Sequence, residues 1–513
     1  MLTKVFGAAV EGIDAIVITI EVNSSRGCCF YLVGLPDSAV KESHQRIICA
    51  LQQSGYKLPV MNTIVNMAPA YIKKEGSAYD LPIAIGLLAA NELIVSDKLD
   101  RYMMMGELSL DGSILPIKGA LPIAIKAHQE HFDGLIVPKQ NAREAGVVNK
   151  LKTYGVSNIK EVIDFFIGKH ELEPTYVNTR EEFEAEQNSF DFDFSDVKGQ
   201  ENVKRALEVA AAGGHNLIMI GAPGSGKSMM AKRLPSILPP LSLRESLETT
   251  KIHSVAGTLD KNTSLITTRP FRDPHHTISQ VAMVGGGVYP QPGEISLSHN
   301  GVLFLDELPE FNRSVLEVLR QPLEDRKITI SRVKYSIDYP AGFMLVASMN
   351  PCPCGYYNHP TKRCNCQPGQ VQRYLNKISG PLLDRIDIQI EIVPVPFEKI
   401  ADSRRGEPSA VIRQRVIAAR KIQEERYSDC QTIHCNAQMS PKLLEKYAHL
   451  ESEELKMLKK AMDMFDLSAR AYDRILKVAR TIADLDNSEN IKPHHLKEAI
   501  GYRNLDRENW AGS

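Results

Sequence analysis

The sequence lacks a net charge of either sign, a long apolar run and a recognisable leader. Its 513 residues carry 61 Lys and Arg against 62 Asp and Glu, so any contact with nucleic acid must come from a local basic patch. No stretch approaches the roughly 18 apolar residues of a membrane span; the best, 81–90, begins Leu-Pro and ends at Asn91. Glu11 and Asp14 interrupt the first apolar run, which makes it a poor signal peptide. We therefore expect no membrane partner.

Cysteine is scarce and unevenly placed. The chain has nine cysteines, an odd number, and those at 352, 354, 364 and 366 crowd together. Secreted disulfide frameworks instead pair an even number of cysteines spread along the chain. We therefore expect a reducing, cytoplasmic setting. The scattered cysteines are interpreted as packing residues: Cys28, Cys29, Cys49, Cys430 and Cys435.

The composition changes along the chain and predicts four segments. A chain of this length is too long for one hydrophobic core. Residues 1–168 alternate short strand-like and helix-like runs, and 169–196 form an acidic linker with little periodicity. Residues 197–396 alternate strand-like and helix-like runs that are separated by glycine-rich turns. Residues 397–513 carry amphipathic helical patterns, with apolar residues three and four positions apart.

A glycine-rich loop lies between a strand and a helix in the third segment. The apolar run 216–220 (NLIMI) is typical of a buried parallel strand, and a helix-forming stretch follows Ser228. Between them stands the motif GxxxxGK[ST]. Its glycines bring backbone N–H groups to the phosphates of a nucleotide. In this motif Lys227 reaches the β- and γ-phosphates and Ser228 holds magnesium. The predicted nucleotide-binding residues are Gly221, Ala222, Pro223, Gly224, Ser225, Gly226, Lys227 and Ser228. We expect ATP and Mg²⁺ as the cofactors.

Acidic and amide side chains end two further predicted strands. The run 301–305 (GVLFL) leads into Asp306 and Glu307, and the run 343–347 (FMLVA) ends near Asn350. The carboxyl ends of the strands of an open α/β sheet form its ligand site. We therefore expect Asp306 to hold the magnesium, Glu307 to deprotonate the attacking water, and Asn350 to place that water against the γ-phosphate.

Together these strings resemble an AAA+ ATPase of the magnesium-chelatase-like branch. GAPGSGKS, VLFLDE, ASMNP and SGPLLDRIDIQIE carry the general likeness, and FRDPHHTIS, NPCPCG and SARAYDRILKVARTIADL are similar to signatures of the YifB/ComM family. The likeness covers essentially the whole chain. It implies an α/β fold class in three parts: an N-terminal Lon-protease-like α+β domain (ribosomal S5 domain 2-like), an AAA+ P-loop α/β core and a C-terminal helical lid.

The resemblance also implies roles for two arginines. Arg385, in LLDRID, matches the position of an arginine finger that reaches across a subunit boundary, a contribution of roughly 10³–10⁵ in rate. Arg470 matches the second sensor arginine, which reports the γ-phosphate to the lid. The alternatives are an ion pair of Arg385 with Asp384 or Asp387, and a solvated helix charge at Arg470. A finger acting in trans needs a neighbour, so the resemblance implies a homo-oligomer, a hexameric ring.

An inserted segment contains a candidate DNA-binding hairpin. Polar and apolar residues alternate at strand period over 325–340, which includes Lys327, Arg332 and Lys334. In relatives of this branch such inserts point into the ring pore and touch DNA. Three cations repeated around a ring would give a positive lining. The alternative is a solvated hairpin face.

Two other features of the inserts carry no assigned chemistry. The glycine- and proline-rich stretch 285–296 predicts a protruding loop or hairpin. His275 and His276 could contact DNA, bind a metal or stabilise the insert, and we favour a structural role.

The four clustered cysteines form a candidate metal site. Cys352, Cys354, Cys364 and Cys366 fall within 15 residues of turn-rich sequence, the composition of a small tetrahedral zinc site. The C-x-C spacing is less common than C-x-x-C, and reduced structural cysteines or a labile disulfide are the alternatives. Zinc here would stiffen the loop that follows Asn350.

The first segment resembles a Lon-type domain without its catalytic dyad. A protease of that type needs a Ser–Lys dyad in which a desolvated lysine activates the serine. Leu121 stands where the lysine is expected, and the nucleophile position falls on Ala78 or Tyr79, with Ser77 and Lys118 nearby but off register. We therefore expect a non-proteolytic scaffold that stacks on the ring or gathers DNA.

Three functional hypotheses follow. The leading one is an ATP-driven ring motor on single-stranded or branched DNA, a helicase or branch-migration factor in recombination and natural transformation. The second is a chelatase-type motor that remodels a protein partner; such motors cooperate with a subunit bearing a D-x-S-x-S site, a string absent from this sequence. The third is a Lon-like protease or general protein remodeller. Stimulation of ATP hydrolysis by DNA separates the first hypothesis from the others.

Overall fold

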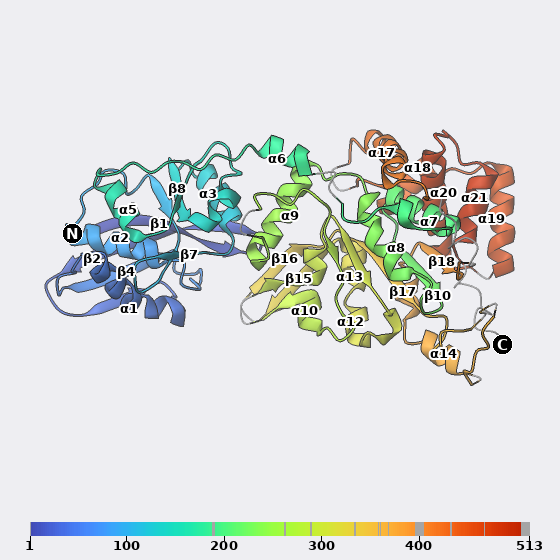
Figure 1. The fold of residues 1–513 in the computed structure, drawn as a ribbon, viewed down its shortest axis with the longest axis horizontal. Helices are drawn as coiled ribbons and strands as arrows, with labels where there is room; N and C mark the ends of the chain where they lie inside the picture. Colours follow the sequence, from blue (N-terminus) through green and yellow to red (C-terminus); the bar gives the residue numbers. More distant parts are fainter. Residues whose placement is uncertain are drawn as a thin grey trace. The chain divides into compact units, whose positions relative to one another are not determined.

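The chain folds as two compact units (Figure 1). The computed structural model describes residues 2–186, 190–260, 263–287, 290–332, 335–357, 359, 361–367, 369–395, 405–430, 433–465 and 467–503. The first unit comprises Met1–Glu186 with Ser242–Thr267, and the second comprises Gln187–Leu241 with Thr268–Ser513. The sequence boundaries at 168, 196 and 396 stay predictions. None of the helices in the described part has the length and apolarity that a membrane span requires.

The first unit is built on a mixed sheet whose described strands have the order β3-β4-β2-β1-β5-β8-β9. β1 and β2 form a long antiparallel hairpin that closes at Glu11 and Asp14, whereas β5, β8 and β9 run parallel to one another. The strands are β1 Leu2–Glu11, β2 Asp14–Ser25, β3 Phe30–Val33, β4 Asn62–Ala68, β5 Tyr102–Met104, β8 Gly134–Pro138 and β9 Lys152–Val156, with a separate pair of β6 Glu107–Leu108 and β7 Ile114–Leu115.

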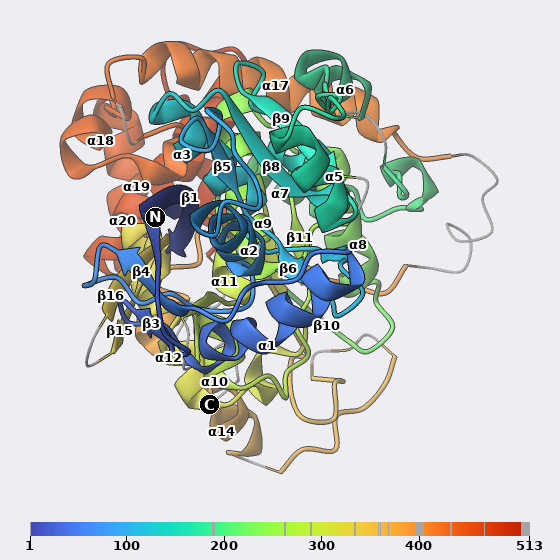
Figure 2. The ribbon, with the colours of Figure 1, turned by 90° about the vertical axis from the view of Figure 1, so that its left-hand side faces the viewer.

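Helices cover this sheet and close the first core. α2 is buried along its whole length because its sequence is apolar on every side, and it contacts β1, β2 and α1 (Figure 2). α9 belongs to this unit by its contacts with α3, although it follows the phosphate loop in sequence. The helices are α1 Ser38–Gln53, α2 Asp80–Ala90, α3 Ala120–Gln129, α4 Ala142–Ala145, α5 Ile159–Phe166, α6 Thr179–Glu186 and α9 Leu243–Ala256.

The second unit contains a parallel sheet whose described strands have the order β11-β14-β17-β10-β18. The strands are β10 Leu217–Gly221, β11 Phe271–Arg272, β14 Val302–Leu305, β17 Met344–Met349 and β18 Ile388–Ile392. β10, β14 and β17 are buried at every residue, as their mainly apolar sequences predict for a sheet covered on both faces. Because the strands are parallel, the residues that follow β10, β14 and β17 meet at one edge of the sheet.

Short helices surround that sheet, and longer ones form the C-terminal part. α7 packs against α17 and α20, so it joins the sheet to the C-terminal helices. Helices around the sheet are α7 Glu201–Gly213, α8 Lys227–Arg233, α10 Gln280–Val284, α11 Glu294–Leu297, α12 Arg313–Glu317, α13 Arg320–Asp325, α14 Gln370–Leu375 and α15 Gly380–Leu383. The C-terminal helices are α17 Ser409–Arg426, α18 Pro441–Tyr447, α19 Ser452–Phe465, α20 Ala469–Leu485 and α21 Pro493–Gly501. The prediction of an α/β fold with a helical C-terminal part is confirmed.

Two inserted hairpins contact one another. β15 (Lys327–Arg332) and β16 (Tyr335–Pro340) are antiparallel, with Lys327 opposite Pro340. β12 (Gly285–Gly286) pairs with β13 (Gln291–Pro292). The hydroxyl of Tyr339 in β16 donates a hydrogen bond of 2.9 Å to the carbonyl of Pro290. The two inserts that the sequence predicts as separate features are therefore linked.

Candidate nucleotide-binding site

The phosphate loop connects the end of β10 to the start of α8. Gly224 and Gly226 have φ angles of 77° and 92°, in the left-handed region where glycine is strongly favoured. This conformation lets successive backbone N–H groups turn toward one point at the N-terminus of a helix. Ser225 Oγ is buried and has no hydrogen-bond partner among the described residues. A free hydroxyl in a loop of this shape fits a phosphate ligand.

Lys227 is the buried cation of the site. Its Nζ donates to the carbonyls of Gly221 at 2.7 Å and Ala222 at 3.1 Å and to Asn350 Oδ1 at 3.2 Å. Burial lowers the pKa of Lys227, and the charges of Asp306 and Glu307 partly offset that effect. Because its three bonded partners are neutral oxygens, the ammonium group can accept an anion without first breaking an ion pair.

Two hydroxyl groups bind the carboxylate of Asp306. Ser228 Oγ donates to Oδ2 at 2.7 Å, and Ser348 Oγ donates to Oδ1. An anionic carboxylate beside a hydroxyl oxygen is the donor set that Mg²⁺ takes in nucleotide sites. The residues present therefore fit the ion. No local motif indicates Ser348, which stands two residues before Asn350 in the run ASMNP.

Glu307 follows Asp306 in an unusual backbone conformation. Its φ of 55° is uncommon for a residue with a side chain. Its N–H donates to Ser348 Oγ at 3.4 Å, and its side chain is 53% exposed. His276 Nδ1 lies 4.0 Å from its Oε2. The carboxylate therefore faces an open space at the sheet edge rather than the core.

A third carboxylate, that of Asp273, follows β11 near the same edge. Burial raises the pKa of Asp273, the charge of Asp306 raises it further, and Lys232 lowers it. No local motif indicates Asp273, because only the pairing of the two-residue strand β11 with β14 brings it near Asp306.

The two arginines implied by the resemblance are engaged within the chain. Arg385 is 8% exposed and binds the carboxylate of Glu324 and the carbonyl of Pro381. Arg470 Nη1 lies 3.1 Å from Asp384 Oδ2, and its side chain is 68% exposed. In the described part of the chain, neither guanidinium contacts the phosphate loop. The expected alternative for Arg385 was a pair with Asp384 or Asp387, but its partner is Glu324.

The four clustered cysteines lie close together. The Sγ atoms of Cys352 and Cys354 are 3.3 Å apart, those of Cys354 and Cys364 are 3.5 Å apart, and those of Cys352 and Cys364 are 3.8 Å apart. The four thiols, Cys366 included, fall within 4.8 Å of one another. A tetrahedral site with Zn–S bonds of about 2.3 Å separates its sulfur atoms by about 3.8 Å. The donor set therefore fits a metal ion.

The hairpin cations are only partly described. Lys327 Nζ forms an ion pair with Asp338 Oδ2 at 2.9 Å across the hairpin. The backbone of Arg332 pairs with that of Tyr335 at the end of β15. Lys334 lies outside the described residues. The alternating pattern of 325–340 does form an antiparallel pair, but Asp338 offsets the charge of Lys327, one of the three cations proposed to contact DNA.

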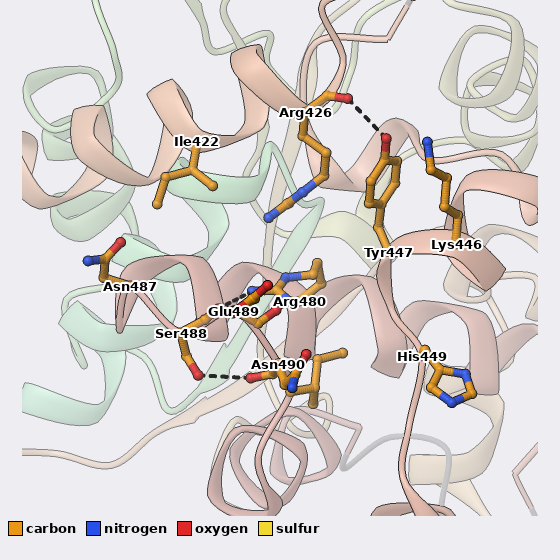
Figure 3. Close-up of a pocket in the computed structure, with 11 residues that line it drawn as sticks. Ile422, Arg426, Lys446, Tyr447, His449, Arg480, Asn487, Ser488, Glu489 and Asn490 are labelled. Carbon is orange, nitrogen blue, oxygen red and sulfur yellow. Dashed lines mark hydrogen bonds between the residues drawn. The ribbon is translucent and has the colours of Figure 1, made fainter.

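A separate cavity of about 420 Å³ lies among the C-terminal helices (Figure 3). Arg426 and Arg480 line it, and both bind the carboxylate of Asp484. Arg480 also donates to the carbonyls of Ser488 and Glu489. Because both guanidinium groups are already hydrogen-bonded within the chain, we prefer the phosphate loop to this cavity as the nucleotide site.

The position expected for a proteolytic lysine is closed in the first unit. Leu121 is fully buried and packs in one cluster with Val147 and Leu265, and its N–H donates to Glu144 at 3.0 Å. A leucine in this apolar cluster cannot deprotonate a serine.

Comparisons with known proteins identify the family of the chain. Three family models match: "Magnesium chelatase, subunit ChlI" over 193–400, "Subunit ChlI of Mg-chelatase" over 20–141 and "Magnesium chelatase, subunit ChlI C-terminal" over 406–503. The chain is 45% identical over 514 residues to YifB of Escherichia coli, covering 99% of this chain and 98% of that protein. It is 44% identical over 508 residues to the competence protein ComM of Haemophilus influenzae, with 99% and 98% covered.

A shorter match concerns Lon protease 2 of Bacillus subtilis, to which the chain is 31% identical over 153 residues, 28% of this chain and 27% of that protein. The expected fold class is thereby confirmed. Matches over nearly the full length of both chains, together with a phosphate loop and an acidic strand on one edge of a parallel sheet, establish the family. The chain belongs to the YifB/ComM family of magnesium-chelatase-like AAA+ ATPases.

Proposed function

We propose that this ATPase is a DNA motor, a helicase or branch-migration factor that acts in the cytoplasm during recombination of incoming DNA. The observation that carries the proposal is its full-length similarity to a protein named for competence, joined to a phosphate loop whose Ser228 contacts Asp306. Competence involves uptake of single strands that must be paired with resident DNA. A motor that moves such a junction would use ATP.

The site residues take distinct roles in hydrolysis. The backbone of Gly221–Ser228 and the ammonium group of Lys227 bind the phosphates, and Asn350 orients the water. Ser228 and Asp306 would hold the magnesium ion, which when bound neutralises charge on the β- and γ-phosphates. The carboxylate of Glu307 accepts a proton from the attacking water at Oε1 or Oε2. Ser348 keeps Asp306 in place through its hydrogen bond.

A homo-hexameric ring supplies the remaining groups. Arg385 acts as the finger for the neighbouring subunit, and for this it exchanges Glu324 for a phosphate. Arg470, on α20, turns from Asp384 to the nucleotide. In both exchanges the guanidinium passes from a carboxylate to a phosphate oxygen, and solvent hydrates the released carboxylates of Glu324 and Asp384, whose side chains are 56% and 35% exposed.

DNA binds at the linked hairpins through Lys327, Arg332 and Lys334. Phosphate contacts of this kind are independent of base sequence and weaken as salt rises. The Lys327–Asp338 pair is exposed on both sides, so a DNA phosphate can compete for the lysine at little cost.

Zinc occupies the cysteine cluster as a structural ion. Cys352, Cys354, Cys364 and Cys366 supply four sulfur ligands, and closed four-sulfur sites of this type stabilise loops rather than catalyse reactions. The loop they close follows Asn350 directly.

A chelatase-type motor that remodels a protein partner is the second candidate. It is favoured by the three family models, all described by the ChlI subunit of magnesium chelatase. Such a motor would respond to a protein and not to DNA.

Hydrolysis measured with and without DNA tests the proposal. The purified chain is assayed alone, with single-stranded DNA and with branched DNA, and Glu307→Gln serves as the catalytic control. We expect a several-fold rise in kcat with DNA that the E307Q variant lacks. Equal rates with and without DNA would favour the protein-remodelling candidate.

A further inference from the structure

His276 lies beside the carboxylate that acts as the general base. The distance from its Nδ1 to Glu307 Oε2 is 4.0 Å. The two residues follow neighbouring parallel strands, since β11 pairs with β14 through Arg272 and Leu303. The strand order of the sheet, rather than closeness in sequence, therefore brings the imidazole to this carboxylate.

Two aromatic rings lie next to the His276 imidazole. The ring of Phe311, which is 4% exposed, meets it edge to face at a centroid distance of 6.4 Å. The ring of His275 lies against it at 4.1 Å. The buried ring of Phe311 packs against the imidazole, whose Nδ1 lies 4.0 Å from the carboxylate.

The carboxylate of Glu307 has few other restraints. Its backbone is fixed by a positive φ and by the N–H bond to Ser348 Oγ. Among the described residues, its side chain forms no hydrogen bond and no ion pair other than the approach of His276. A general base must point at its water within hydrogen-bond reach, and apo sites often tighten only when substrate binds.

We propose that His276 is a positioning residue for ATP hydrolysis. Its Nδ1–H donates to the carboxylate of Glu307 at about 3 Å when nucleotide is bound and holds that carboxylate toward the attacking water. The proposal rests on Glu307 as the base and does not depend on DNA. Because His276 makes no hydrogen bond to the phosphate loop in the described structure, its loss affects kcat and not nucleotide affinity.

His275 provides a matched control. It stacks on the same ring, but its Nδ1 pairs with Thr277 Oγ1 at 2.9 Å. His275→Ala therefore removes a neighbouring imidazole of equal size without removing the group that faces Glu307.

The test compares kcat and KM for ATP, without DNA, in four variants of the full chain. Asparagine places its amide nitrogen where histidine has Nδ1, whereas the glutamine amide reaches to the position of Nε2. We expect His276→Ala to lower kcat at least tenfold, with KM unchanged within twofold. His276→Asn should restore most of the lost kcat, whereas His276→Gln should restore little of it. His275→Ala should have the kcat and KM of the unaltered chain.

The proposal is overturned if H276A hydrolyses ATP at the normal rate, if H275A falls as far as H276A, or if H276Q equals H276N. Should H276A fail to fold, the comparison of H276N with H276Q decides alone, since both keep a polar side chain of similar volume. If DNA did not stimulate hydrolysis, the kcat values of these variants relative to the unaltered chain would stay the same. The proposal for His276 and the proposal of a DNA motor can therefore fail independently.

Discussion

Gly355 of the cysteine loop lies directly against Pro223 of the phosphate loop. A Cβ atom placed on Gly355 would lie 2.5 Å from Pro223 Cδ, closer than any packed side chain tolerates. Residue 355 therefore has to be glycine for the two loops to touch. Through this contact, the conformation that the cysteines impose on their loop reaches the nucleotide site.

The contact predicts that Gly355→Ala weakens nucleotide binding. The added methyl group would push Pro223 and displace the phosphate loop, and we expect Kd for ATP to rise about fivefold or more, about 1 kcal/mol. Gly369→Ala is the matched control, because Gly369 has a φ of 77° against 80° for Gly355 but nothing within 4 Å of its Cβ position. Titration of a fluorescent ATP analogue measures both. Equal Kd values for the two variants would contradict the coupling.

Ser348→Ala should impair use of magnesium. The hydroxyl holds Asp306 Oδ1, and loss of a group that orients a metal ligand costs about 10–100-fold in metal affinity or activity. We expect the Mg²⁺ concentration for half-maximal hydrolysis to rise while binding of metal-free ATP stays unchanged. A variant with the normal magnesium dependence would show that Ser348 does not position Asp306.

Zinc content tests the cysteine cluster. The chain purified without chelator should hold about one zinc ion, and Cys364→Ser should lose it, because three thiolates bind zinc less tightly than four. Cys430→Ser is the control, since Cys430 lies outside the cluster. Elemental analysis that finds no metal in the unaltered chain, or equal zinc in both variants, would exclude the zinc site.

Two ion pairs on α20 should differ in their effect on stability. Arg474 Nη1 lies 2.9 Å from Asp387 Oδ1, whose side chain is 1% exposed, whereas the Arg470–Asp384 pair is largely exposed. Asp387→Asn leaves Arg474 without its buried partner, and we expect a loss of about 3–5 kcal/mol in the free energy of unfolding. Asp384→Asn should cost less than about 1 kcal/mol. Urea unfolding compares the two, and equal losses would contradict the burial argument.

The same carboxylate gives a pH dependence. Burial alone would raise the pKa of Asp387, but Arg474 and His215 outweigh it and hold that pKa well below its ordinary value. The stabilisation is therefore fully present above about pH 4, the ordinary range of an aspartate. It is lost as the pH falls below that value. Asp387→Asn should remove this part of the acid sensitivity, and an unchanged acid limb in urea unfolding would contradict the assignment.

Those parts of the nucleotide site that consist of consecutive residues could be predicted from the sequence. Gly221–Ser228 connect strand to helix as the motif predicts. Ser228, at the start of α8, meets Asp306, which follows β14 directly, at 2.7 Å. Strand period likewise predicted the antiparallel pair of 325–340.

Contacts set by strand order could not be predicted in this way. Ser348, Asp273 and His276 carry no local pattern, and only the neighbourhood of β11, β14 and β17 brings them to Asp306 and Glu307. The ion-pair partner of Arg385 could not be predicted either, because tertiary packing determines it. Nothing in LLDRID indicates Glu324, which precedes Arg385 by 61 residues.

Movement of a DNA junction tests the central claim most directly. A synthetic three- or four-stranded junction with labelled arms is incubated with the chain and ATP, and the separated products are resolved on a gel. We expect the unaltered chain to move the branch only with hydrolysable ATP, and E307Q, which retains Lys227 and the phosphate loop, to leave the junction in place. An unmoved junction under conditions in which the unaltered chain hydrolyses ATP would contradict a DNA motor.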